Sequence, residues 1–286
     1  MGTVGLNWPL NYDYKYYYIM KQMFFLHGLP RAGNTLLGSI LNQNPKIAVT
    51  ANSICADMLG EIYSLKNTDI FKNFPDHKSF DSVTKSLFQN YYKDWLADYI
   101  IDRAPWGLPI NLKFLKEIQD NIKIVVLVRD VPEILASFIK HSKKESTSFV
   151  NQFEAKTIEE KSDMLMNQEG QIVKELIGIK HLLDHQPKEM YHIVEYNDLC
   201  DNPKGTIEGI YDFLGIYRFN HRYNRLDQFQ VNGMKYDDNI VGQNLHTIET
   251  NSINSNNYNE FKENVNDILP KSIIEKYNNL NFWKVK

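Results

Sequence analysis

The loop at residues 28–36 carries the glycines and the charged side chain best suited to chemistry in this chain. From Gly28 to Thr35 the sequence matches G-x-x-x-x-G-K-[ST] at every fixed position but one, because Asn34 stands where the lysine belongs. An apolar run from Met23 to Leu26 precedes the loop, and residues 36–41 follow it with helical periodicity. A strand, a glycine loop and a helix in this order direct backbone N–H groups and a helix N-terminus toward an anion.

A cation inside the loop strengthens the prediction of an anion site. Arg31 lies between the two glycines, whereas the lysine that nucleotide kinases use is missing. The predicted contacts are therefore the Arg31 guanidinium and the backbone N–H groups of Gly33 to Leu36. From the loop alone, two alternatives stay open: a kinase-like phosphate site, and a strand, turn and helix that bind no ligand.

Residues 29–36, Leu-Pro-Arg-Ala-Gly-Asn-Thr-Leu, resemble the 5′-phosphosulfate loop of sulfotransferases, P-[KR]-S-G-[TN]-T. These enzymes use 3′-phosphoadenosine 5′-phosphosulfate (PAPS) and release 3′-phosphoadenosine 5′-phosphate (PAP). The resemblance implies that PAPS is the cofactor and that Arg31 is also a catalytic cation. It places the cofactor against six consecutive residues: Arg31, Ala32, Gly33, Asn34, Thr35 and Leu36.

A second stretch, residues 125–137, resembles the 3′-phosphate motif of the same family. In that motif a strand ends in Arg-Asp and a serine follows eight residues after the arginine, and here Arg129 and Ser137 have this spacing. An arginine can donate two parallel hydrogen bonds to phosphate, and a serine hydroxyl can add a third. The structural alternative is that Arg129 pairs with an acid and Ser137 is a small packing residue.

Further stretches extend the resemblance along the chain. The segment around Tyr196 resembles the family's Y-E-D-L strand end, which implies that this tyrosine lies near the adenosine. Residues 101–105 resemble the D-K-x-P segment of tyrosylprotein-type and bacterial members, which implies that Arg103 lies near the transferring sulfuryl group. Residues 239–248 resemble a late L-H-x-[IV]-R motif, although a glutamate replaces its final arginine. Lys235, in the same segment, is a further expected phosphate contact.

The general base is the least defined part of the predicted site. In tyrosylprotein-type relatives the base is a glutamate of a G-E-E-T stretch, and the corresponding residues here are Thr50-Ala-Asn-Ser53. Asn52 therefore holds the base position, although an amide cannot take up a proton at neutral pH. Asp57, Glu61 and Asp102 are the nearby acids that could replace it, and Asp57 is the one expected. No metal is expected, because a sulfuryl group carries less charge than a terminal phosphate.

The elements that must position these residues alternate between strands and helices. Such alternation predicts an α/β fold with a central, mostly parallel sheet, and the resemblance implies the P-loop NTPase-like sulfotransferase fold. Ligands of such sheets bind beyond the carboxyl ends of the strands, so the glycine loop, Arg103 and Arg129 should meet at one edge. The expected strands are 22–27, 47–49, 99–102, 122–128 and 190–195. The expected helices are 34–43, 54–65, 80–98, 109–118, one after Pro132, 155–184, 203–214 and 270–280, with a loop at 68–80.

Length and composition restrict the class of protein. The chain has 286 residues and a net charge of −3, which argues against a general nucleic-acid binder. Its two cysteines form no disulfide or metal pattern, and no apolar run approaches the ~18–20 residues of a membrane span. A single cytoplasmic domain, residues 1–286, is expected. Its expected parts are an N-terminal segment (1–21), a core (22–216), a flap (217–257) and a C-terminal helical segment (258–286).

The motifs together predict a sulfotransferase. It would move a sulfuryl group from PAPS to an acceptor hydroxyl of a small molecule, glycan or lipid, by in-line transfer without a metal. The sequence names neither the acceptor nor an oligomeric state. One alternative is a P-loop kinase-like enzyme that uses ATP. Another is a nucleotide-binding protein that has lost catalysis, which the amide of Asn52 would suit.

Overall fold

The computed structural model describes residues 20–168, 170–248, 253 and 264–284. Five strands form one parallel sheet with the order β2-β3-β1-β4-β5. β1 is at the centre, so the loop that follows it emerges from the middle of the sheet edge. The strands are β1 (Gln22–Gly28), β2 (Ile47–Val49), β3 (Tyr99–Arg103), β4 (Ile124–Val128) and β5 (Tyr191–Glu195).

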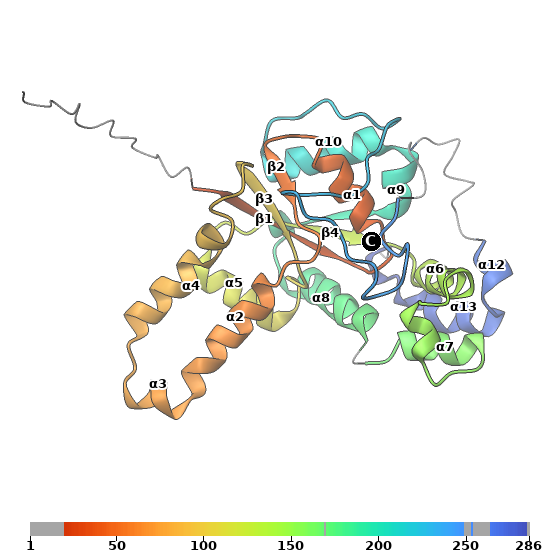
Figure 1. Cartoon of the computed structure of the whole chain (residues 1–286), viewed down its shortest axis with the longest axis horizontal. Helices are drawn as coiled ribbons and strands as arrows, with labels where there is room; N and C mark the ends of the chain where they lie inside the picture. Colours follow the sequence, from red (N-terminus) through yellow and green to blue (C-terminus); the bar gives the residue numbers. More distant parts are fainter. Residues whose placement is uncertain (1–19, 169, 249–252, 254–263, 285–286) are drawn as a thin grey trace, which may run out of the picture.

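Helices cover both faces of the sheet (Figure 1). α1 and α10 lie on one side and α5 and α8 on the other, while α2, α3 and α4 form an arm that projects away from the sheet. α6, α7, α12 and α13 gather at the opposite end of the molecule. The bounds are α1 (Asn34–Leu41), α2 (Cys55–Ser64), α3 (Asp69–Asn73), α4 (His77–Tyr91), α5 (Pro109–Ile118), α6 (Val131–Lys144), α7 (Ile158–Leu165), α8 (Gln171–His185), α9 (Tyr196–Asp201), α10 (Pro203–Leu214), α12 (Val265–Ile268) and α13 (Lys271–Tyr277).

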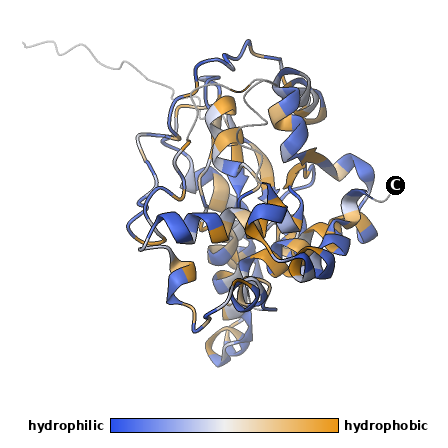
Figure 2. Cartoon of the chain, turned by 90° about the vertical axis from the view of Figure 1, so that its right-hand side faces the viewer, coloured by the Kyte–Doolittle hydropathy of each residue, from blue (hydrophilic) through white to orange (hydrophobic). Residues whose placement is uncertain are grey.

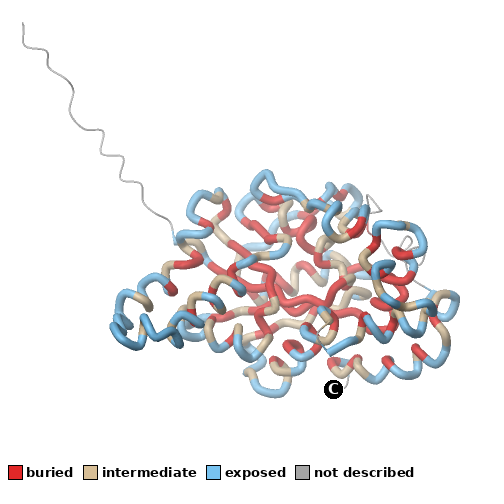
Figure 3. The backbone as a smooth tube through the Cα atoms, turned by 60° about the horizontal axis from the view of Figure 1, so that its bottom comes forward, coloured by how far each residue is buried: buried red, intermediate tan, exposed pale blue. Residues whose placement is uncertain are grey.

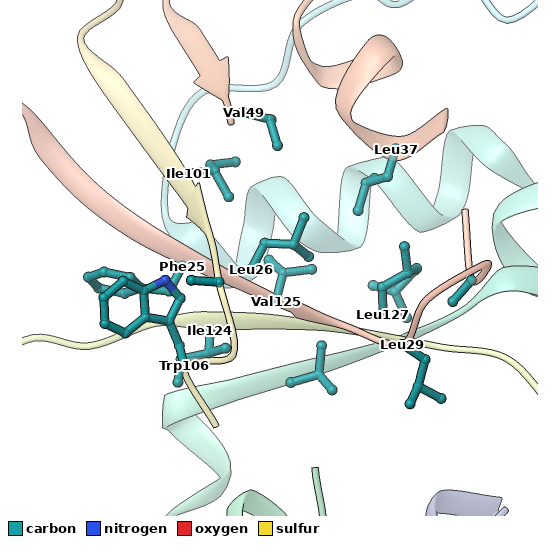
Figure 4. Packing of buried hydrophobic residues seen from close by; sticks show 14 of the residues in the cluster. Phe25, Leu26, Leu29, Leu37, Val49, Ile101, Trp106, Ile124, Val125 and Leu127 are labelled. Atoms are coloured by element: carbon teal, nitrogen blue, oxygen red, sulfur yellow. The ribbon is translucent and has the colours of Figure 1, made fainter. Parts of the chain in front are cut away.

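The core follows the strands, which are apolar because helices cover both faces of the sheet. All five residues of β4 are buried, and so are the last six of β1. Figure 2 shows the apolar strands inside the polar outer faces of the helices, and Figure 3 shows the same strands as the most buried part of the chain. Phe25 packs edge-on against Trp106 with ring centroids 5.1 Å apart (Figure 4). Full burial of one such side chain stabilises the fold by about 1.5–3 kcal/mol.

The predicted α/β fold and parallel sheet are confirmed, and each strand begins and ends within two residues of its prediction. The predicted helix at 80–98 is wrong at both ends, because α4 begins at His77 and ends at Tyr91. The Asp76 carboxylate caps the start of α4 by accepting from the backbone N–H of Ser79 (3.0 Å). At the other end Tyr92 is fully buried, and its hydroxyl donates to Asp102.

Two other predictions of helical structure need correction. The predicted loop at 68–80 contains the short helix α3, whose first turn is capped by the Thr68 side chain. The predicted helix at 155–184 is two helices, because a capping box of Thr157 and Glu160 begins α7 and Gly170 precedes α8. The short helix α9, at the end of β5, was not predicted.

The predicted flap lies partly outside the described residues. Its described part up to residue 248 contains no helix or strand, apart from an isolated bridge between Val231 and Met234. Most of the expected N-terminal segment and residues 254–263 also lie outside the described ranges. Among the residues that the structure describes, no helix is long and apolar enough to cross a membrane.

Candidate active site

The glycine loop between β1 and α1 needs an unusual backbone. Arg31 (φ 59°) and Gly33 (φ 88°) both have left-handed conformations. A Cβ on Gly33 would lie 2.7 Å from the Tyr196 ring, and a Cβ on Gly28 would lie 1.9 Å from the Asn34 side chain. The two fixed glycines of the motif therefore allow close approaches that no other residue permits.

The start of α1 leaves donors for an anion. Its first helical hydrogen bond runs from the N–H of Leu37 to the carbonyl of Gly33 (2.8 Å), so the helix itself does not use the N–H groups of residues 34–36. The predicted contact Ala32 differs, because its N–H already donates to the carbonyl of Leu29 (3.2 Å). Thr35 and Leu36 are half-buried at this helix start.

The side chain of Asn34, which stands at the position of the missing lysine, points back into the loop. This buried amide donates to the carbonyl of Leu29 at 2.7 Å and so braces the loop. Its Oδ1 atom is buried and accepts no hydrogen bond within the described part of the chain. Asn34 thus offers a ligand its backbone N–H, while its side chain holds the loop closed.

The structure brings the residues of the two predicted phosphate motifs together. The Arg31 Nε donates to the Ser137 hydroxyl (3.0 Å), and an N–H of Arg129 donates to the carbonyl of Arg31 (3.0 Å). Tyr196 lies under this cluster, with the Arg129 guanidinium 4.4 Å from its ring centre. Burial raises the pKa of the Tyr196 phenol, so the ring stays neutral at physiological pH. Four predicted cofactor residues therefore meet at the carboxyl ends of β1, β4 and β5.

Arg129 also pairs with an acid, as the structural alternative predicted. Its Nε donates to the Glu133 carboxylate one helical turn later, at 3.0 Å, and both side chains are buried. This pair fixes one edge of the guanidinium, and the remaining N–H groups lie beside Arg31 and Tyr196. A held guanidinium of this kind loses little conformational freedom when it binds phosphate.

Arg103 lies at the end of β3 and adds a positive charge to the sheet edge, besides those of Arg31 and Arg129. Its backbone N–H donates to Thr50 (2.7 Å), and its guanidinium donates to the carbonyl of Ala51 (2.9 Å) and to the side-chain oxygen of Asn52. Asn52, which holds the expected base position, is therefore a hydrogen-bond acceptor for Arg103. The Arg103 side chain borders a cavity of about 350 Å³ that Asp57, an exposed residue, also lines. The cavity is lined by Gly28, Asn52, Ser53, Asp57, Arg103, Ala104, Pro105, Leu108, Gln171, Lys174 and Glu175.

The flap reaches the cluster through a residue other than the predicted one. Lys235 is an exposed side chain just after the Val231–Met234 bridge, and no contact among the described residues joins it to the cluster. Instead the carbonyl of Leu245 accepts a hydrogen bond from Arg31. Leu245 lies in the L-H-x-[IV] stretch, so the sequence contained a signal for this contact.

The next flap residue is also held in place. The His246 ring stacks on Tyr236 with centroids 3.7 Å apart, and its Nδ1 lies 2.5 Å from the Asp238 carboxylate. Burial, more than the nearby arginines, lowers the pKa of His246. Glu175, by contrast, lies at the predicted edge on a helix for which no motif gave any signal.

These features define a P-loop-type α/β protein with cationic side chains at the centre of its sheet edge. The model of the sulfotransferase family matches residues 24–220, which is more than half of the chain, so the chain belongs to this family and is a sulfotransferase. Among curated proteins, none matches the chain.

Two solved sulfotransferase domains have the same fold. The sulfotransferase domain from the curacin biosynthetic pathway has a TM-score of 0.57 at 15% identity, over 90% of this chain and 96% of that one. The sulfotransferase domain of the Synechococcus PCC 7002 olefin synthase has a TM-score of 0.50 at 14% identity, over 93% and 96%. A mouse sulfotransferase complexed with PAP has a TM-score of 0.49 at 12% identity, over 93% and 84%.

Proposed function

We propose that this enzyme transfers a sulfuryl group from PAPS to an acceptor hydroxyl, by in-line displacement and without a metal. The observation that carries the proposal is the junction of two motifs: Arg31 of the loop donates to Ser137, and Arg129 donates to the Arg31 carbonyl. A nucleotide with phosphates at both its 5′ and 3′ positions needs two such sites side by side. The acceptor is a small molecule, glycan or lipid that carries the hydroxyl.

The residues present fit such a cofactor. The free N–H groups at the start of α1 and the Arg31 guanidinium would hold the 5′-phosphosulfate, and Arg129 with Ser137 would hold the 3′-phosphate. Tyr196, half-buried beside Arg129, would lie against the adenosine. PAPS supplies the sulfuryl group, and Arg31 and Arg103 supply positive charge where negative charge develops on the leaving oxygen. An ATP-dependent enzyme would need a lysine in the loop. Asn34 stands in that position instead, and its side chain is turned to the Leu29 carbonyl.

The experiment that tests this proposal is a thermal-shift titration with PAP, with ATP–Mg²⁺ and with AMP. A ligand that binds only the folded chain stabilises it by about 2.7 kcal/mol at a concentration of 100 Kd. We expect a shift with PAP alone. Arg129→Ala should lower PAP affinity by at least tenfold, since a charge-assisted hydrogen bond contributes about 1.5–3 kcal/mol.

Arg218→Ala is the matched control, because Arg218 is an exposed arginine that pairs with Asp212 and Glu208 away from the cluster. It should leave the PAP shift unchanged. A shift with ATP–Mg²⁺ and none with PAP would contradict the proposal and favour a kinase-like enzyme.

A further inference from the structure

A buried carboxyl group lies in the cavity beside Arg103. Glu175, in the second turn of α8, is only 7% exposed and lines the same cavity as Gly28, Asn52 and Arg103. The cavity therefore joins the end of β1, the cation at the end of β3 and one carboxylate. In the proposed transfer, an acceptor hydroxyl that enters this cavity would lie between Arg103 and Glu175.

Close packing through two glycines brings Glu175 to this position. A Cβ on Gly178 would lie 2.4 Å from the His27 ring, and a Cβ on Gly107 would lie 2.8 Å from the carbonyl of Gly178. α8 can therefore lie directly against the end of β1 and the loop after β3. Because Glu175 is three residues before Gly178, it lies on the same face of the helix, next to the glycine loop.

The hydrogen bonds of His27 leave one oxygen of the Glu175 carboxylate without a donor. The N–H of Gly107 donates to His27 Nδ1 (3.1 Å), so the proton of the neutral ring is on Nε2. That Nε2 donates to the backbone carbonyl of Glu175 at 2.9 Å. The Glu175 Oε2 atom lies 3.1 Å from the same nitrogen, yet it accepts no hydrogen bond within the part of the chain that the structure describes. A buried carboxylate oxygen without a donor is costly unless a ligand supplies one.

From this geometry we infer that Glu175 is the general base of the transfer, held in place by His27. The inference rests on the proposed function. The acceptor oxygen forms a bond to sulfur, the bond between sulfur and the 5′-phosphate oxygen breaks, and PAP leaves with that electron pair. The proton of the acceptor hydroxyl moves to the Glu175 carboxylate, which becomes a neutral acid beside Arg103.

Glu175 suits this role better than the acids near it in sequence or space. Asn52 cannot take up a proton, and its side-chain oxygen is bound by Arg103. Asp57 also borders the cavity, but its side chain is exposed to solvent, whereas Glu175 is buried. Burial raises the pKa of Glu175 and outweighs the opposing charge of Arg103, and a carboxylate with a raised pKa accepts a proton more readily. Asp57, the acid expected from the sequence, is replaced by Glu175 in this assignment.

The test uses transfer from PAPS to water, because water also loses a proton and no acceptor needs to be known. Release of sulfate and PAP is followed for wild type, Glu175→Gln and the control Asp184→Asn, an exposed carboxylate on the same helix. We expect Glu175→Gln to lose about 10²–10⁴-fold in kcat, while its Kd for PAP stays within twofold. The wild-type rate should rise with pH through one ionisation, and Glu175→Gln should lack this rise. Asp184→Asn should match wild type.

A second variant separates a base from a structural carboxylate. Glu175→Ala leaves space in the cavity, so added sodium formate should restore a concentration-dependent part of the lost rate. Absence of rescue, or a Glu175→Gln rate equal to wild type, overturns the inference. The inference is also overturned if Asp57→Asn or His246→Asn abolishes the transfer to water while Glu175→Gln keeps the wild-type rate. A wild-type chain that neither binds PAP nor consumes PAPS overturns the proposed function, and the inference with it.

Discussion

At the scale of single residues, Gly33 connects the backbone of the loop to Tyr196 in the proposed cofactor site. Its φ of 88° is left-handed, and a side chain there would collide with the Tyr196 ring. We expect Gly33→Ala to lower the free energy of unfolding by more than the ~1–2 kcal/mol that left-handed strain alone costs. It should also weaken PAP binding by at least tenfold, because Tyr196 must move. Urea unfolding and calorimetric titration with PAP measure the two effects.

Gly233 provides the matched control for this prediction. Its φ of 77° is similar, but a Cβ there would meet open space. Gly233→Ala should therefore show the strain alone, with PAP affinity unchanged. Equal effects of the two variants would mean that contact with Tyr196 does not matter.

The cluster of Arg31, Arg129 and Ser137 could be predicted from sequence, whereas the cavity could not. Arg129 and Ser137 have a fixed spacing along one strand and helix, so a local pattern is sufficient to place them. Glu175 reaches its position only because Gly107 and Gly178 let two distant segments pack closely. That packing is a tertiary contact, and nothing near Glu175 in sequence indicates it.

At the scale of elements, the strands could be predicted from sequence, whereas the breaks between helices could not. Buried parallel strands such as β4 are apolar throughout, so their position is clear from sequence. The breaks between helices depend on particular side chains. α7 begins where Thr157 and Glu160 cap each other, and α4 ends where Tyr92 turns inward to Asp102. Periodicity alone does not detect either event.

The attachment of the flap to α6 gives a prediction at this scale. His141 on α6 donates from Nε2 to the carbonyl of Gln243 (2.9 Å), and two residues later the carbonyl of Leu245 binds Arg31. His141→Ala should lower the opening free energy of residues 242–247 by about 1 kcal/mol, the net contribution of one hydrogen bond. Amide hydrogen exchange there should become about fivefold faster. His185→Ala, an exposed histidine on α8, should leave this exchange unchanged, and equal protection in both variants would contradict the attachment.

At the scale of the whole molecule, the buried acids beneath the site should influence overall stability. Burial raises the pKa of both Asp102 and Glu175 in the folded chain. Between the usual pKa of a carboxyl and its raised folded value, the unfolded chain binds fewer protons than the folded one. Such an acid stabilises the fold fully only below its usual pKa, and this contribution is lost as pH rises. These buried acids therefore reduce the stability of the fold near neutral pH, as is common where a site needs a desolvated group.

Glu175→Gln tests this linkage without any turnover. Because glutamine does not ionise, the melting temperature of the variant relative to wild type should rise as pH increases from about 4.5 to 7.5. Asp184→Asn should show almost no slope in this range, because the hydrogen bond from Lys180 lowers the pKa of this exposed acid and its linkage lies at lower pH. Melting curves of the three proteins across this pH range measure both slopes. If the difference in melting temperature between Glu175→Gln and wild type does not change with pH, the Glu175 carboxyl is as well solvated as a surface acid. That result would contradict a base of raised pKa in this cavity. A positive slope together with lost transfer would tie the stability of the fold and its chemistry to the same proton.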